Sequence, residues 1–501
     1  TILLIAFWLV PLVGNLDWLG GLPWKNENEN GYPFVRLIRM LLSGDLFDGP
    51  YRFPWLTILV LFGLARAAVR LRTSLARWGV ILFIVSFALL MGRTNWGSAY
   101  GVVPLHGELE VIRYLVGVQF CGVLLAALCV AEWCERALSW RPSASNRVAI
   151  VLGVVATAVH LGAAWDWNRT VLRTFSDGDS DYEELVDQLR ARRTQGRFLC
   201  HRQLGTARHF ELNLAGALAE APHLLSYGRG YHDTLSLYYL ENFSFRDSEL
   251  SLYNVGTVVV SRDLAGTVRI PGAMKRIFAN STYEIFAADR SPGYFDVIRT
   301  PFEIEGDPKR LRGLVQTLAA SMYEVRVLPR LVREPSTTAE RTLGLAADGN
   351  PIWRLGDQAT LSADVARLLR ATADGYRDRP IRSRVIEERF SANEYTARVS
   401  MGSSPDERLM LKVSYHPYWS ATIDGAQREI AHLAPNLMAL AVPEGEHTVA
   451  FRFRTPPYQK VLLLCSLLCV LGCLVAGWAR MSRGFKLAPT ARATSRGCDR
   501  G

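Results

Sequence analysis

Cysteine is scarce in the polar part of this chain. Six of the eight cysteines lie in apolar stretches and a seventh lies in the basic C-terminal tail, which leaves Cys200 alone between residues 168 and 460. A single thiol cannot build a disulfide framework, and the Cys-x-x-Cys spacing of a zinc site does not occur in the sequence. The cysteines in the apolar stretches behave as small hydrophobic residues. The composition therefore excludes a disulfide-rich or zinc-stapled domain.

Long apolar runs are also missing from residues 168–460, although they occur on both sides of this segment. Runs close to the ~20 residues that cross a bilayer occupy residues 55–71, 78–91, 114–133, 148–165 and 461–478, and residues 1–13 form a sixth. The polar segment thus follows the fifth run and precedes the last, so it has to lie on one side of the membrane. The sequence predicts a multipass α-helical membrane protein of about six helices, forming an incomplete bundle. Because the chain begins without Met inside its first run, we expect further residues before it.

Acidic residues are outnumbered, and the net charge is +10. A basic surplus is typical of nucleic-acid-binding proteins, but here the basic residues cluster next to the ends of apolar runs. The three clusters are Arg66, Arg70, Arg72 and Arg77; Arg136, Arg141 and Arg147; and Arg480, Arg483, Lys486, Arg492, Arg496 and Arg500. If the helices alternate, all three clusters lie on one side, as the positive-inside rule expects of the cytoplasmic side. The charge therefore indicates topology and no nucleic-acid partner, with the polar segment on the outer side.

The polar segment divides further by composition and periodicity. Strands of period two joined by short turns, with Asp424-Gly425 as a hairpin signal, are typical of a small antiparallel β-sandwich near the C-terminus. An earlier part mixes helical and strand patterns, and the stretch between them is rich in Arg, Pro, Gly and Asp. The predicted divisions are residues 1–167 (membrane helices and outer loops), 168–330 (extracytoplasmic α/β domain), 331–384 (connector), 385–457 (β-sandwich), 458–479 (final membrane helix) and 480–501 (basic cytoplasmic tail).

An amphipathic pattern precedes the second apolar run. Residues 33–43 have the apolar spacing of a helix, interrupted by Arg36 and Arg39. A short helix of this kind lies in the membrane interface, with its arginines directed to lipid headgroups.

Two strings in the predicted sandwich are recognisable. SYHPYWSATIDG occupies residues 414–425 and PEGEHTVAFRF occupies residues 443–453, shortly before the last apolar run. This arrangement resembles the C-terminal end of bacterial YfhO-type polytopic membrane proteins, which are similar to the glycosyltransferase C superfamily. LYNVGTVVV at residues 252–260 resembles another strand of that family, so the resemblance covers roughly residues 168–478.

The resemblance implies a protein of the bacterial cytoplasmic (inner) membrane that transfers a sugar from a polyprenyl-phosphate carrier to a cell-envelope glycan on the outer face. In that family the catalytic acid is expected in the first outer loop of a larger helix bundle, and it cannot be carried over to any position here. A non-catalytic envelope assembly or scaffold protein, with an outer domain that binds a glycan or a partner, is the alternative. A transporter fits less well, because the apolar runs carry almost no charged residues.

Residues 92–113 form an outer loop with candidate site residues. Arg93 and Arg113 flank the loop, and their guanidinium groups match the oxygens of a lipid phosphate. The alternative role for both arginines is to anchor helix ends at the interface. Glu108 and Glu110 lie between them, where a carboxylate could serve as general base for an acceptor hydroxyl or simply be solvated.

Two more sets of residues are candidates outside the membrane part. Asp177, Asp179 and Asp181 alternate in the sequence and could hold a divalent cation, although acids at this point also suit the start of a helix. Tyr415, Tyr418 and Trp419 could form an aromatic platform for a glycan ring, although such residues also fill sandwich cores.

Overall fold

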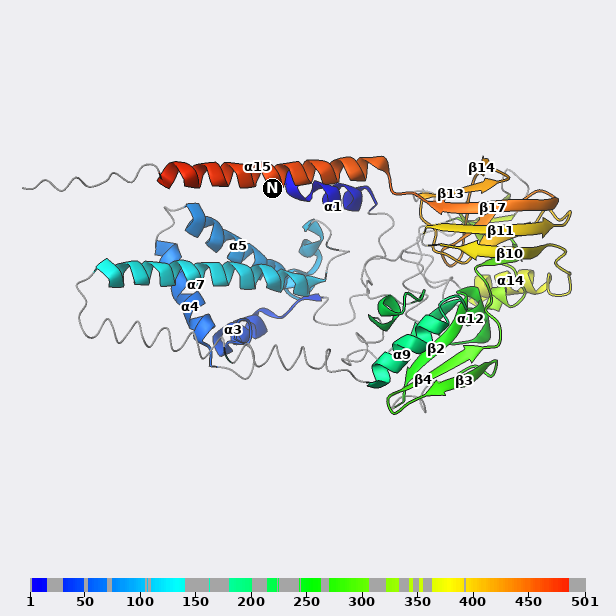
Figure 1. Ribbon diagram of the computed structural model, residues 1–501, viewed down its shortest axis with the longest axis horizontal. Helices are drawn as coiled ribbons and strands as arrows, with labels where there is room; N and C mark the ends of the chain where they lie inside the picture. Colours follow the sequence, from blue (N-terminus) through cyan, green and yellow to red (C-terminus); the bar gives the residue numbers. More distant parts are fainter. Residues whose placement is uncertain are drawn as a thin grey trace, which may run out of the picture.

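The computed structural model describes residues 2–15, 30–48, 53–69, 74–103, 106, 110–139, 162, 180–200, 214–222, 224, 243, 245–262, 270–305, 321–332, 342–345, 351–354, 363–391 and 393–485. Figure 1 shows an elongated molecule with α-helices toward one end and β-sheets toward the other. The C-terminal helix α15 (Pro457–Phe485) leaves the sheets and runs back beside the other helices. Helix α1 (Ile2–Gly14) packs along α15.

Three helices form the core of the helical end. These are α4 (Trp55–Val69), α5 (Ser74–Leu90) and α7 (Tyr114–Ser139), and α7 packs against both of the others. They share an apolar cluster in which Val60 and Leu125 are almost completely buried. The shorter helices of this part are α3 (Phe34–Ser43), α6 (Gly92–Trp96), η2 (Gly97–Val102) and η3 (Val111–Arg113).

Two helices of the described part are long and apolar enough to cross a membrane, Val111–Trp133 and Pro457–Ala476. A third span is present if Ala76–Leu90 and Gly92–Val102, which meet at 81°, count as one. Helix α4 is apolar but shorter, at 15 residues. The predicted run at residues 148–165 lies outside the described residues except for position 162. The described residues therefore contain two or three apolar spans, and the number of six stays a prediction.

The first β-sheet lies beside helix α9 (Ser180–Ala191) and has the strand order β1-β2-β4-β3. Its central strand β2 is buried along its whole length. Val259 packs against α9 residues such as Leu189, whereas Val258 and Val260 face a second cluster. Coverage on both faces explains the unbroken apolar run in this strand. The strands are β1 (Arg197–Cys200), β2 (Val255–Ser261), β3 (Met274–Ala279) and β4 (Tyr283–Ala288), with α12 (Asp247–Leu252) before β2.

Two larger sheets pack face to face, one with the order β10-β11-β17-β13-β14 and the other with the order β5-β12-β16-β15-β7-β6-β9-β8. Leu409 and Leu411 of the second sheet meet Val449 and Phe451 of the first sheet in a shared core. The strands of the five-stranded sheet are β10 (Arg384–Phe390), β11 (Glu394–Met401), β13 (Trp419–Ile423), β14 (Ala426–Arg428) and β17 (Gly445–Phe453).

The eight-stranded sheet draws on chain segments well outside the predicted sandwich. Its strands are β5 (Phe295–Arg299), β6 (Glu303–Glu305), β7 (Arg330–Val332), β8 (Thr342–Leu345), β9 (Pro351–Arg354), β12 (Glu407–Leu411), β15 (Ala431–Leu433) and β16 (Leu437–Leu440). The stretch 331–384, expected to be a connector, thus supplies β8 and β9 and also helix α14 (Ala363–Asp374). Strand β9 joins the sheet by pairing in parallel with β6, Trp353 opposite Ile304, and β8 pairs with β9. Strand β5 pairs with β12, Val297 opposite Leu409, which ties the earlier segment to the later one.

The structure has a hairpin turn at Asp424-Gly425, where the sequence predicts one. Asp424 and Gly425 join β13 to β14, and both have positive φ, 49° and 85°. Positive φ at both central residues is the geometry of the tight hairpin turn that Asp-Gly favours.

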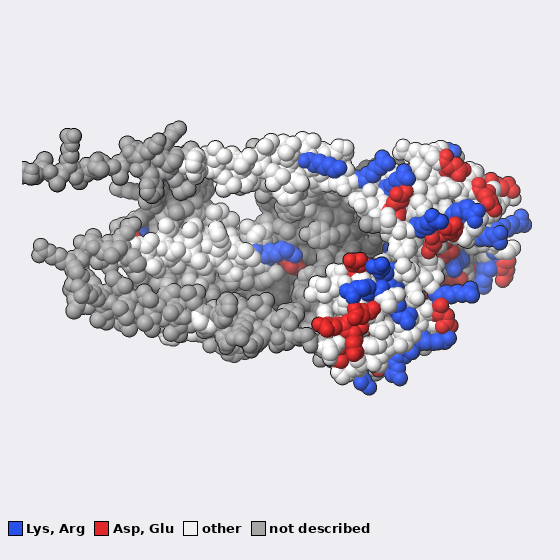
Figure 2. Space-filling view, in the orientation of Figure 1, with Lys and Arg blue, Asp and Glu red and all other residues white. Residues whose placement is uncertain are grey.

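Charged side chains gather on the β-rich end of the molecule, whereas the described surface of the helical end carries few of them (Figure 2). This separation agrees with apolar helices that face lipid and a polar domain that faces water.

Candidate functional site

Tyr418 lies where the five-stranded sheet meets the membrane helices. Its hydroxyl is 2.8 Å from the hydroxyl of Tyr458, which lies in the first turn of α15. The same oxygen accepts a hydrogen bond from Asn15 Nδ2 at 3.0 Å, just beyond the end of α1. Both helices therefore hold the loop that contains Tyr418 against the start of an apolar span.

The other two predicted platform residues lie in different surroundings. Trp419 begins β13 and packs beside Phe453 and Tyr395, with ring centroids 5.3 and 5.9 Å away. Tyr418 shares the Phe453 ring, at 6.1 Å. Tyr415 instead stacks on His432 at 4.6 Å with an angle of 23° between the rings. The structure thus brings Tyr418 and Trp419 together around Phe453 and pairs Tyr415 with a different ring.

His416 belongs to the same aromatic group. Its Nδ1 accepts a hydrogen bond from the backbone N–H of Tyr418 at 3.1 Å, and its ring lies edge-on to that of Tyr418 at 4.4 Å. Burial lowers the pKa of His416, which favours the neutral ring that can accept this bond. The motif SYHPYWSATIDG contains His416, but only the fold reveals its role in holding the Tyr418 backbone. One feature of the sequence could have indicated the contact with Tyr458: a tyrosine stands at the start of the last apolar run, where the membrane interface is expected.

The predicted residues of the loop 92–113 are engaged in local contacts where they are described. The Arg93 guanidinium donates to the carbonyl oxygen of His106 and lies over the Tyr100 ring at 5.2 Å. Arg113 is 3.5 Å from Glu110, and 68% of its side chain is exposed. Glu108 lies outside the described residues. The exposed end of Arg113 therefore remains accessible to an anion, with Glu110 beside it.

The acidic alternation is described only at its last member. Asp181 lies in the first turn of α9, which begins at Ser180 as expected for a helix start. Hydrogen bonds from Ser281 and Thr282 lower the pKa of Asp181. Asp177 and Asp179 lie outside the described residues. In the described part of the chain, no group of three or more His, Cys, Asp or Glu side chains is placed to hold a metal ion.

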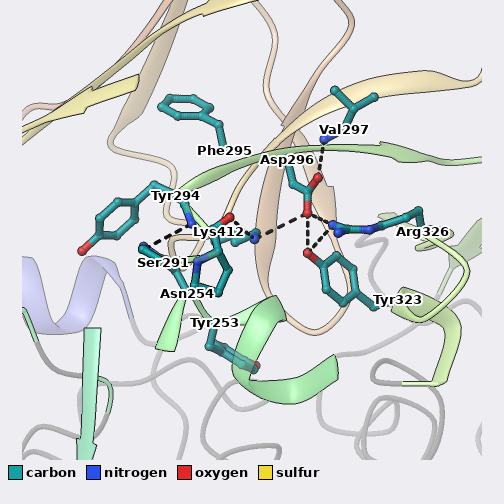
Figure 3. A network of polar contacts seen from close by, with 12 residues as sticks. Tyr253, Asn254, Ser291, Tyr294, Phe295, Asp296, Val297, Tyr323, Arg326 and Lys412 are labelled. Atoms are coloured by element: carbon teal, nitrogen blue, oxygen red, sulfur yellow. Dashed lines mark hydrogen bonds and ion pairs between the residues drawn. The ribbon is translucent and has the colours of Figure 1, made fainter. Parts of the chain in front are cut away.

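A partly buried polar network joins three chain segments at the eight-stranded sheet (Figure 3). The Asp296 carboxylate, on β5, forms an ion pair with Arg326 and accepts a hydrogen bond from the Tyr323 hydroxyl. Lys412, just after β12, places its Nζ 3.5 Å from the same carboxylate and 3.3 Å from the Pro292 carbonyl oxygen. Three chain segments thus converge on one carboxylate.

Two further charged groups border this network. Arg197 donates to the carbonyl oxygens of Tyr253 and Lys412 at 2.7 and 2.8 Å. Glu388 accepts from the backbone N–H groups of Tyr294 and Phe295. The Lys412 side chain is fully buried. Burial and the neighbouring Arg326 lower the pKa of Lys412 to about 7.

The sequence pattern did not single out this network. Its members lie in three separate segments, and Lys412 occupies a position that strand alternation assigns to the solvent side. The signal that was present is a lysine within an otherwise apolar run, LMLKV at residues 409–413.

No protein-family model matches this chain, and no curated protein matches it significantly. A solved structure of arabinofuranosyltransferase AftD from mycobacteria is similar to 91% of the chain, with 12% identity and a TM-score of 0.31. A mutant form of AftD gives 14% identity over 91% of the chain, also with a TM-score of 0.31. The chain spans 41% and 43% of those proteins, less than half of their length. The chain is thus similar to a mycobacterial arabinofuranosyltransferase only at a level that does not establish a common fold.

Proposed function

We propose that this chain belongs to a membrane glycosyltransferase, or a relative of one. It would transfer a sugar from a polyprenyl-phosphate carrier to a cell-envelope glycan on the outer face of a bacterial inner membrane. The outer domain would bind and orient the glycan.

The contact between Tyr418 and Tyr458 is the observation that supports this proposal. It holds an aromatic loop of the polar domain at the start of an apolar span. Aromatic rings suit the faces of sugar rings, and a sugar attached to a lipid carrier is presented at this same depth. The proposal thus places glycan recognition next to the membrane surface.

The chemistry needs few groups. An acceptor hydroxyl oxygen forms a bond to the anomeric carbon, while the bond from that carbon to the carrier phosphate breaks and the phosphate keeps the electron pair. A carboxylate takes the hydroxyl proton, and Glu110 is our candidate. Arg113, beside it, and Arg93 would stabilise the charge on the departing phosphate.

Replacing Glu110 by Gln tests the proposal. Membranes containing the chain would be assayed with labelled polyprenyl-phosphate sugars, and we expect Glu110→Gln to lower transfer by about a hundredfold or more, because general bases contribute on this scale. Glu446→Gln, at an exposed carboxylate near the start of β17, is the matched control and should leave transfer unchanged. Full transfer by the Glu110→Gln protein would remove Glu110 from the mechanism.

A non-catalytic scaffold is the second candidate, and one observation favours it. The candidate carboxylates in the described part, Glu110 and Asp181, are both engaged in local contacts, with Arg113 and Ser281 respectively. If no donor in a broad panel supports transfer while the chain still retains envelope glycans, the scaffold function replaces the enzyme.

A further inference from the structure

Helix α3 borders a groove of about 620 Å³ at the helical end of the molecule. Arg36 and Arg39 line the groove together with Asp45. Its remaining lining is apolar or nearly so, from Pro33, Val35 and Met40. Two guanidinium groups against one carboxylate give the groove a net positive charge, and Asp45 already accepts a hydrogen bond from Ser43 at 2.7 Å.

Helix α3 has three distinct faces. One face is docked, with Leu37 completely buried in the core of the helical end. Arg36 and Arg39, three residues apart, lie next to each other on a second face. The third face is apolar and exposed: Phe34, Val35 and Leu42 are 51%, 70% and 66% accessible. A helix with a basic face beside an exposed apolar face lies in the plane of a membrane interface.

The first end of α3 is held by Asn95, from the neighbouring helix α6. Asn95 Oδ1 accepts a hydrogen bond from the Phe34 N–H at 3.0 Å, and its Nδ2 donates to the Tyr32 carbonyl oxygen at 2.7 Å. The N-terminus of the helix is thus capped by a side chain from another segment, which satisfies an N–H that has no partner within the helix.

The second end of α3 is fixed by Gly44 and Asp48. Gly44 ends the helix with φ at 93°, and a Cβ there would lie 2.8 Å from Pro54 Cβ. The buried Asp48 carboxylate accepts hydrogen bonds from the Leu56 and Thr57 N–H groups, both at 2.9 Å. The groove is therefore carried by a helix that is anchored at both ends, so the backbone that bears its two arginines is fixed before any ligand binds.

We propose that this groove binds the phosphate of an anionic bilayer phospholipid, with Arg36 and Arg39 as the phosphate ligands and the exposed apolar face of α3 against the acyl chains. Guanidinium groups are suited to phosphate because they offer several N–H donors in one plane. The Arg36 guanidinium also lies over the Tyr32 ring, 5.3 Å from its centre, and Arg36 and Pro33 both line the groove. Phospholipid binding at this site is independent of sugar transfer, so the lipid would be bound without any sugar donor.

The positive charge of the groove and the apolar surface beside it both favour a membrane phospholipid over a soluble phosphate compound. The arginines complement an anionic headgroup, and the apolar lining of the groove continues onto Phe34, Val35 and Leu42, which a soluble phosphate would leave in water. A lipid satisfies both at once.

The experiment measures lipid binding by the full chain in detergent. Native mass spectrometry and thermal unfolding would be followed with short-chain phosphatidylglycerol, short-chain polyprenyl phosphate or inorganic phosphate as the probe. For the double variant Arg36→Gln and Arg39→Gln, we expect the dissociation constant for phosphatidylglycerol to rise about tenfold or more. Arg77→Gln is the matched control. Arg77 is an exposed arginine near the start of α5, and the rise of an α-helix places it about 20 Å from Leu90 at the other end of that helix.

Each outcome is decisive. Loss of binding in the double variant, with binding kept in Arg77→Gln and unchanged circular dichroism in both, supports the site. Equal losses in both variants, or no loss in either, overturn it. Tighter binding of polyprenyl phosphate than of phosphatidylglycerol would assign the groove to the carrier, and equal binding of inorganic phosphate would show that no lipid is recognised; either result overturns the proposed occupant.

Discussion

At the scale of single residues, Lys412 shows how burial competes with pairing. Its ammonium group is within 3.5 Å of the Asp296 carboxylate, yet Arg326 binds the same carboxylate. Two cations that share one carboxylate leave one charge poorly compensated, and removal from water penalises that charge. This explains why the pKa of Lys412 falls to about 7 although an acid lies beside it.

The lowered pKa predicts a pH dependence of stability. Between about pH 7 and the ordinary lysine pKa of 10.5, the unfolded chain holds a proton that the folded chain has released. The free energy of unfolding should therefore rise with pH across this window, by at most about 1.4 kcal/mol per pH unit, and this contribution should be constant below pH 7. Lys412→Met should remove that part of the slope, as measured by urea unfolding in detergent between pH 6 and pH 10.

Lys275→Met is the control for this measurement. Lys275 is an exposed lysine on β3 that pairs with Asp289, and its replacement should leave the slope intact. A slope that persists in Lys412→Met would show that another group titrates in this window.

Strand alternation alone assigns Lys412 to a solvent-exposed face, whereas this face of the sheet is buried. The pattern of Leu409, Leu411 and Val413 predicts one buried face and one solvent face. In the structure Met410 is also completely buried, in the cluster on the other face of the sheet. The sheet is covered on both faces because distant segments pack on its outer side, and a pattern of adjacent residues carries no information about them.

At the scale of elements, the anchoring of α3 decides the shape of the groove. Asp48 accepts three hydrogen bonds, two from the backbone at the start of α4 and one from the Thr57 hydroxyl at 2.7 Å. It links the turn after α3 to the next helix, α4, and satisfies N–H groups that the first turn of α4 leaves open.

Asp48→Ala should therefore destabilise the helical end. A lost N-terminal cap costs about 1 to 2 kcal/mol, and the midpoint of thermal unfolding in detergent should fall accordingly. Asp45→Ala, three residues earlier in the same turn and exposed, serves as the matched control and should have little effect. If the two variants unfold at the same temperature, Asp48 does not anchor the turn.

The elements that local pattern specifies were predictable. The amphipathic spacing of residues 33–43 predicts α3 almost to the residue, and Asp424-Gly425 predicts its hairpin. Strands β4 and β5 lie on either side of Pro292-Gly293, yet they do not pair with each other. Strand β4 joins the first sheet while β5 joins the eight-stranded sheet, since β5 finds its partner in β12, which is far away in the sequence.

At the scale of the whole molecule, the hydroxyls of Tyr418 and Tyr458 connect the polar domain to the membrane helices. The position of Tyr418 beside α15 was not predictable from the motif, because the motif indicates an aromatic strand entry and says nothing of the helix that follows β17. The candidate residues Glu110 and Arg113 could be predicted to lie in one loop, whereas their pairing required the structure.

A double-mutant cycle measures this connection. Tyr418→Phe and Tyr458→Phe each remove one hydroxyl, and we expect their effects on the free energy of unfolding to be coupled by about 1 kcal/mol. The same cycle between Tyr418→Phe and Tyr376→Phe, beyond the end of α14, should show no coupling. Additive effects of the first pair would mean that the two hydroxyls do not interact in solution.

The route from β17 into α15 has a mechanical consequence. Strand β17 has hydrogen-bonded neighbours on both sides, β11 and β13, and only a few residues separate it from the membrane helix. A pull on α15 along the strand direction would load both ladders in shear, so that many hydrogen bonds must break together rather than one after another. A pull transmitted through α15 along β17 would thus move the whole sandwich before its sheet yields.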